Sequence, residues 1–155
     1  MGTNAIQRSD GGVAFVDDST ASEVHRFGGT GFRAYKIAKV ALAGVAATTG
    51  GALFAWQNPE NVSIIVDRLE LDITTKSTGA ANGSFGTAAN GTTSSANLID
   101  TYALGGTEKV VNNIDDKGAG GKSVQKMTTS QFITGTGSAT TAGLVGFVYI
   151  HYYLI

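Results

Sequence analysis

The final thirteen residues, Gly143–Ile155, constrain the fold more than any other part of the chain. They read GLVGFVYIHYYLI, a run of aromatic, β-branched and other apolar residues with no Asp, Glu, Lys or Arg. Such residues fit the pleated, half-buried surface of a β-strand. An uncovered strand of this composition would be prone to aggregate. The run therefore predicts a strand that is central in a sheet or sandwiched between layers, with large apolar residues on both faces. One alternating set is Val145, Phe147, Tyr149, His151 and Tyr153, and the other is Val148, Ile150, Tyr152 and Leu154.

A second strand is predicted over Val62–Thr75. Its later half places Leu69, Leu71 and Ile73 on one face and charged residues between them, the period of two expected when one face is buried. We favour a strand over a short helix for Tyr35–Ala43, because glycines follow it closely. Further short strands are predicted at Ala52–Trp56, Ser123–Thr129 and Gln131–Thr134, and Asn97–Leu104 and Val110–Ile114 are each either a short strand or a turn.

Turns are predicted at the many Gly and Asn positions between these strands. Ala-Ala-Asn-Gly occurs twice, at Ala80–Gly83 and Ala88–Gly91, and Asn-Gly favours a two-residue hairpin turn. The piece between them, Ser84–Thr87, is either a strand of small residues or a loop. Gly135–Ser138 is predicted to turn the chain toward the final strand. Many short strands without a long helix predict an all-β fold, a single jelly-roll-like β-sandwich. The pattern does not distinguish the strand order of a jelly roll from that of an immunoglobulin-like sandwich.

Residues 1–34 differ from the remainder, which suggests an extended N-terminal arm before a β-sandwich domain at residues 35–155. The segment is polar and broken by glycines, with scattered apolar residues that would contact a partner. A first strand at Val13–Val16 followed by a loop explains the pattern equally well. The candidate contact residues of the arm are Val13, Phe15, Val16, Phe27 and Phe32.

Composition excludes several classes of function. The net charge of −1 gives no electrostatic support for nucleic-acid binding, and the absence of Cys removes disulfides and thiolate chemistry. The N-terminus lacks the apolar core of a secretory signal. Val40–Trp56 is uncharged, but it is at the short limit for a membrane span and contains Gly50-Gly51, so two strands joined by a turn fit better.

No catalytic, cofactor or metal motif is found. His25 lies in the predicted arm, and His151 lies in the aromatic final strand, where a packing role is expected. Asp115-Asp116 lacks the spaced acidic ladder of a calcium loop. No Gly-x-Ser-x-Gly motif nominates a serine nucleophile. We therefore expect a protein that is not an enzyme and needs no cofactor.

One part of the chain resembles a known family. Phe54–Glu60 and Ile64–Ala80 resemble small structural proteins of tailed bacteriophages that are encoded near the major capsid protein. The likeness continues through Ala89–Asp100, Asp116–Ser123 and Ala142–Gly146, and so covers about residues 52 to 155. It implies a capsid decoration, or cement, protein on the outer surface of the virion. Such a protein would clamp neighbouring major capsid proteins. Symmetric assembly favours small closed oligomers, and a homotrimer would suit the three-fold positions of a capsid.

Two other functions are consistent with the sequence. One is another virion component, such as a tail-tube, spike or fibre subunit. The other is a carbohydrate-binding sandwich, for which Trp56 with Gln57, Asn58 and Glu60 is the candidate site. We expect Trp56 to be a core or interface residue instead.

Overall fold

The computed structural model describes residues 5–7, 13–15, 35–106 and 110–155 of the chain. The chain divides into two units, Met1–Arg33 and Ala34–Ile155. In the first, strand β1 (Ala5–Gln7) pairs antiparallel with strand β2 (Val13–Phe15). The remainder of the predicted arm is outside the described residues, so the arm stays a prediction.

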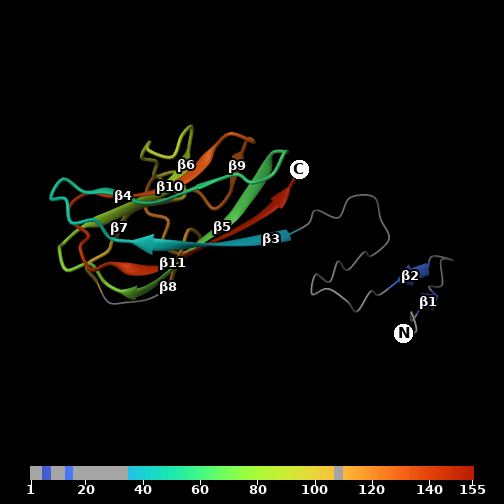
Figure 1. The fold of residues 1–155 in the computed structure, drawn as a ribbon, viewed down its shortest axis with the longest axis horizontal. Helices are drawn as coiled ribbons and strands as arrows, with labels where there is room; N and C mark the ends of the chain where they lie inside the picture. The colour runs from blue at the N-terminus through green and yellow to red at the C-terminus, as the bar shows by residue number, and fades with distance from the viewer. Residues whose placement is uncertain (1–4, 8–12, 16–34, 107–109) are drawn as a thin grey trace. The chain divides into compact units, whose positions relative to one another are not determined.

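Every regular element among the described residues is a strand (Figure 1), as predicted. No helix in this part of the chain is long and apolar enough to cross a membrane. The strands of the second unit are β3 (Tyr35–Ala43), β4 (Gly51–Gln57), β5 (Ile64–Thr75), β6 (Asn82–Ala88), β7 (Ile99–Ala103), β8 (Val110–Asn112), β9 (Gln125–Met127), β10 (Phe132–Gly137) and β11 (Val145–Leu154).

The strands form two antiparallel sheets of a β-sandwich. One sheet has the order β3-β11-β5-β8, with β9 also paired with β5, and the other has the order β4-β10-β6-β7. The chain passes between the sheets at β3 to β4, β4 to β5 and β5 to β6, and β10 and β11 return to the middle of their sheets. This strand order is that of the jelly roll, in which two Greek keys wrap around one core. The predicted fold class is confirmed.

Strands β5 and β11 form the centre of their sheet, and β11 pairs with β3 on one side and with β5 on the other. The central position of the C-terminal strand is therefore confirmed. Its side chains Val148, Ile150 and Tyr152 are buried and pack against Leu69 and Leu71 of β5 in one core cluster. The alternation predicted for β5 is also confirmed, since Arg68, Glu70 and Asp72 lie on the opposite face.

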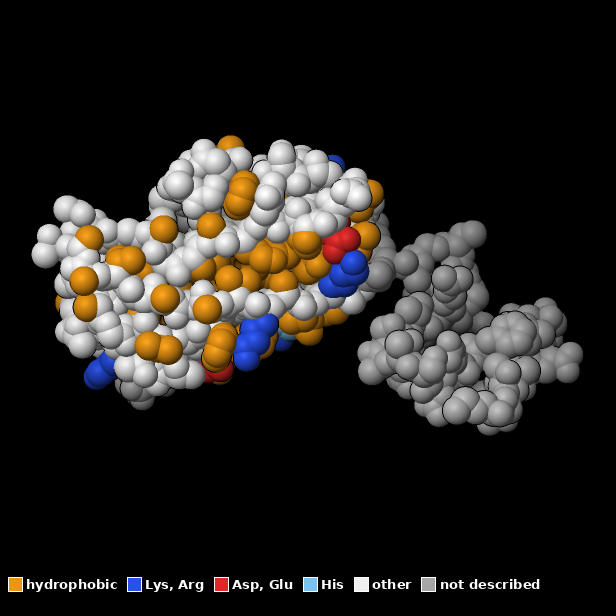
Figure 2. Space-filling view, viewed as in Figure 1, with side chains coloured by type: hydrophobic (Ala, Val, Ile, Leu, Met, Phe, Trp, Pro, Cys, Tyr) orange, Lys and Arg blue, Asp and Glu red, His pale blue; other side chains and the backbone are white. Residues whose placement is uncertain are grey.

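The predicted pair of strands around a glycine turn is confirmed between β3 and β4. Gly50 has a φ of +78°, which a residue with a Cβ rarely adopts. Strands β3 and β4 are edge strands of the two sheets and lie on the same side of the sandwich. Figure 2 shows apolar side chains gathered on this side, where Ala38, Val40 and Trp56 pack half-buried against the core.

Two turn predictions are wrong. Asn82 and Gly83 do not form a hairpin turn, because both lie in strand β6. Gly135 does not turn the chain either, because it lies inside strand β10. A Cβ at this position would lie 2.5 Å from an atom of the Phe54 ring and 2.8 Å from the Phe85 ring. Gly135 is therefore needed because the two stacked rings, 6.1 Å apart, occupy the space of a side chain.

A buried asparagine ties the short strands β8 and β9 to β5. Asn113 is fully buried, and its Oδ1 accepts a hydrogen bond of 2.7 Å from the backbone N–H of Leu69. Its Nδ2 donates to the carbonyl oxygens of Lys122 and Ser123, at 3.0 and 2.9 Å. One side chain thus satisfies backbone groups from β5 and from the segment before β9.

Candidate interaction surface

One face of the β3-β11-β5-β8 sheet points away from the core, and we call it the outer face. Its residues alternate with buried ones along each strand. The larger side chains of the outer face are Tyr35, Ile37 and Lys39 of β3, Val145, Phe147, Tyr149, His151 and Tyr153 of β11, Ile65, Asp67, Arg68, Glu70 and Asp72 of β5, Val110 and Asn112 of β8, and Lys126 of β9.

The outer face is unusually apolar for a sheet surface that contacts water. Of the eight large apolar side chains that are exposed among the described residues, four lie here: Tyr35 (54%), Ile37 (58%), Val110 (56%) and Val145 (52%). Sheets with one solvated face normally carry polar residues at such positions. Clustered exposed apolar side chains are typical of a surface that binds a partner.

The aromatic side chains of β11 form a ridge across the middle of the outer face. Tyr149 is opposite Lys39 of β3 on one side and Glu70 of β5 on the other. The ammonium group of Lys39 lies 3.7 Å from the ring centre of Phe147 and 5.5 Å from that of Tyr149. These are cation–π contacts. Lys39 therefore covers part of the ridge in the isolated chain.

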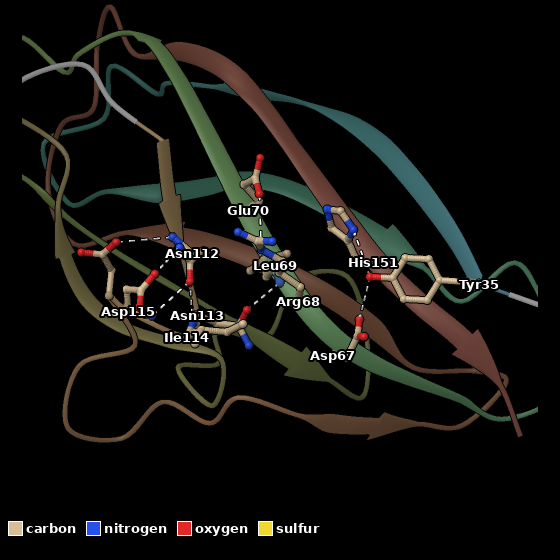
Figure 3. A network of polar contacts seen from close by, with 11 residues as sticks. Tyr35, Asp67, Arg68, Leu69, Glu70, Asn112, Asn113, Ile114, Asp115 and His151 are labelled. Carbon is tan, nitrogen blue, oxygen red and sulfur yellow. Dashed lines mark hydrogen bonds and ion pairs between the residues drawn. The ribbon is translucent and has the colours of Figure 1, made fainter. Parts of the chain in front are cut away.

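A β-bulge in β5 brings a polar network to one end of the ridge. The register between β11 and β5 shifts between His151 and Tyr152, which places both Asp67 and Arg68 on the outer face. Figure 3 shows Tyr35 of β3 between His151 and Asp67. The Tyr35 hydroxyl lies 3.2 Å from Nδ1 of His151 and donates to Asp67 at 3.4 Å. Burial and the Asp67 carboxylate raise the pKa of Tyr35.

His151 therefore has a polar partner within the sheet, which agrees with the predicted packing role. Its neighbour across the strands, Arg68, has its Nε 3.4 Å from Oε2 of Glu70 (Figure 3). The Nε atom is nonetheless buried and makes no hydrogen bond among the described residues. This distance and geometry indicate a weak ion pair.

The predicted carbohydrate site around Trp56 is occupied by the protein's own side chains. Trp56 packs half-buried against the core, with its ring centre 5.4 Å from that of Tyr152. Glu60 accepts hydrogen bonds of 2.8 Å from Lys36 and 3.0 Å from Tyr152. The Lys36 hydrogen bond lowers the pKa of Glu60, and burial together with Glu60 raises the pKa of Tyr152 to about 12. Trp56 is thus a partly buried residue at the border of the core, which agrees with the expectation that it is a core or interface residue.

Candidate metal ligands do not cluster among the described residues. No group of three or more His, Asp or Glu side chains in residues 35–106 and 110–155 is arranged to hold a metal ion. Asp115 accepts a hydrogen bond from the side chain of Asn112, and both belong to a turn after β8. An open depression of about 480 Å³ is lined by residues 76–82, 103, 105 and 106, mostly with small side chains and backbone.

The described residues do not test the arm residues that we predicted as partner contacts. Val13 and Phe15 belong to strand β2, and Val16, Phe27 and Phe32 lie outside the described residues, as does His25. The outer face was not predicted from the sequence as a binding surface. The pattern that could have indicated it is the alternation in Tyr35–Ala43. Its odd-numbered residues include Tyr35 and Ile37, which pair with Tyr153 and His151 of the outward-facing set of β11.

Comparison with known proteins adds a fold relationship. Neither a known protein family nor a curated protein matches the sequence. A solved structure described as the capsid of Ralstonia phage GP4 contains a chain of similar fold, with a TM-score of 0.50 and 16% identity. The similarity covers 81% of this chain and 86% of that one. At this identity, the comparison shows a shared fold.

Proposed function

We propose that this chain is a structural protein of a tailed-bacteriophage virion that decorates and stabilises the capsid. The observation that carries the proposal is the fold shared with a chain of the Ralstonia phage GP4 capsid over most of both chains. The resemblance of residues 52–155 to phage structural proteins supports the same role. The proposed location is the outer surface of the capsid.

In this proposal the protein acts by burying surface rather than by chemistry. It binds neighbouring major capsid proteins as a homotrimer, through contacts that exist only in the assembled shell. Contacts present only in the assembled state favour that state by mass action. The apolar outer face supports this mechanism, because buried apolar area contributes about 25 cal/mol per Å². The proposal requires neither a cofactor nor an enzymatic activity.

The N-terminal segment is proposed to bind the capsid through Val13, Phe15, Val16, Phe27 and Phe32. These apolar side chains are spaced along a polar segment, as expected of anchors on an extended chain. Residues 16–34, which follow strand β2, would span up to about 65 Å if fully extended, enough to reach a neighbouring capsid subunit.

Co-sedimentation with empty phage heads that lack this protein tests the proposal. The full chain is expected to pellet with heads, and a Phe15→Ser, Phe27→Ser, Phe32→Ser variant is expected to bind at least about tenfold more weakly. A control with Ser19→Ala, Thr20→Ala and Ser22→Ala should bind like the wild type. If the full chain does not pellet with heads, the decoration role is overturned. A chain that polymerises alone into long tubes would favour a tail-tube subunit instead.

A further inference from the structure

We infer that the outer face is the surface through which two copies of this chain associate, with the β3 border of one copy against the β5–β8 border of the next. The inference goes beyond the proposed function, because it concerns a contact between two copies and depends neither on capsid binding nor on the homotrimer.

The apolar ridge indicates that the outer face is covered by a protein surface. Phe147, Tyr149 and Tyr153 are half-buried along β11, and exposed apolar side chains lie on both sides of them, at Ile37 and Val110. A sugar would need an open aromatic ring to stack on. The ammonium group of Lys39 already lies over the Phe147 ring, which makes a second protein surface the better occupant.

The charges on the outer face make it complementary to another copy of itself. Lys39 is the charged residue that β3 contributes, whereas β5 contributes Glu70 and Asp72. Arg68 lies beside Glu70, but no hydrogen bond or ion pair engages the Asp72 carboxylate among the described residues. Near Glu70 and Asp72 the β5–β8 border is therefore acidic and the β3 border opposite is basic, whereas Lys126 of β9 lies farther along β5, beside Ile65.

These opposite charges cannot neutralise each other within one copy. Lys39 and the acidic residues of β5 are separated by strand β11, so they are two strand spacings apart, about 10 Å. That separation is close to the screening length at physiological salt. A second copy that places its β3 border over the β5–β8 border brings Lys39 next to Asp72, while the aromatic ridges bury each other.

The size of the outer face is sufficient for a specific contact. Four strands at about 4.8 Å spacing and ten residues at about 3.3 Å rise give about 600 Å² per copy. Specific interfaces bury about 600–1,000 Å² per partner. Both copies present the same face, so the contact is isologous and closes at two copies about a two-fold axis.

Charge reversal in the full-length protein tests the inference by sedimentation equilibrium. Lys39→Glu and Asp72→Lys should each weaken self-association at least about tenfold, because like charges then face each other across the contact. The double variant Lys39→Glu, Asp72→Lys should regain wild-type association, because both charges are exchanged. Lys117→Glu, a reversal on an exposed turn away from the outer face, should associate like the wild type. Circular dichroism of each variant confirms that it is folded.

Mixing the two single variants sharpens the test. An equal mixture should form a species of two copies, because the reversed β3 border of one variant meets the reversed β5 border of the other. The inference is overturned if the wild type is monomeric at about 100 μM, if the single reversals associate normally, or if the double variant fails to recover.

Head co-sedimentation separates this inference from the proposed function. A monomeric wild type that still pellets with heads would remove the inference and leave the decoration role in place. A chain that self-associates as described but does not pellet with heads would support the inference and overturn the decoration role.

Discussion

The buried side chain of Asn113 gives the sharpest test of how the sandwich is held together. Asn113→Ala removes the acceptor of the Leu69 N–H and the donor to the Lys122 and Ser123 carbonyls. The Leu69 residue is fully buried, so its N–H loses its partner where water does not reach, at a cost of about 2 kcal/mol. The two carbonyls belong to exposed residues and can be rehydrated, so each loss costs about 1 kcal/mol.

We therefore expect Asn113→Ala to lower the free energy of unfolding by about 4 kcal/mol. With a urea m-value of about 2 kcal/mol/M, the midpoint of urea unfolding would fall by about 2 M. Amide hydrogen exchange should show the matching local effect, with faster exchange of the Leu69 N–H. This would place the energetic role of Asn113 at the junction of β5 with β8 and β9.

Two further variants make the reasoning refutable. Asn90 is exposed and accepts hydrogen bonds from the backbone N–H groups of Thr92 and Thr93, which water can replace. Asn90→Ala should therefore cost about 1 kcal/mol or less. In Asn113→Asp, an ionised carboxylate would face two carbonyl oxygens, so the gap to the wild type should narrow as the pH falls toward about 4 and the new group is protonated. A loss below about 1 kcal/mol for Asn113→Ala, or one equal to that of Asn90→Ala, would refute the argument.

Three other substitutions test separate features of the fold. Thr101 has a φ of 61°, which is strained for a β-branched residue. Thr101→Gly should therefore raise the free energy of unfolding by about 0.5–1 kcal/mol and raise Tm. A lower Tm for this variant would contradict the backbone strain. Gly135→Ala should lower stability by about 1–3 kcal/mol in urea unfolding because the new Cβ meets the Phe54 ring, whereas Gly106→Ala, with its nearest atom at 3.7 Å, should be nearly neutral. Burial and Glu60 raise the pKa of Tyr152 to about 12, above the ordinary tyrosine value of about 10. The contribution of the Tyr152 hydroxyl to the free energy of unfolding is therefore present below pH 10 and lost as the pH rises toward 12. Tyr152→Phe should remove a step near pH 12 from a spectroscopic tyrosine titration of the folded protein.

Period-two patterning allowed the sequence to predict the long strands. In β5, the alternation of Leu69, Leu71 and Ile73 with charged residues corresponds to a buried and a solvated face. In β3, the glycines after Ala43 correctly favoured a strand over a helix. These predictions succeed because the burial of each residue depends on which face of its own strand it occupies.

Local turn signals were less reliable, because packing between the sheets overrides them. Gly135 reads as a turn residue, yet it is in the interior of β10, where the Phe54 and Phe85 rings leave no room for a side chain. Asn82-Gly83 likewise continues a strand. No feature of the sequence near Asn113 shows that its partners are in β5 and in the segment before β9, since those residues are distant along the chain.

The sequence by itself determined that Gly143–Ile155 is a strand and that both of its alternating sets are large and apolar. It did not determine which set is buried, because the hydrophobic effect favours either choice by similar amounts. The tertiary structure decided this, since the second sheet covers Val148, Ile150 and Tyr152 and leaves Phe147, Tyr149 and Tyr153 on the outer face. The neighbouring strands then place Lys39 and Asp72 on opposite sides of that ridge, a juxtaposition that depends on strand order and register.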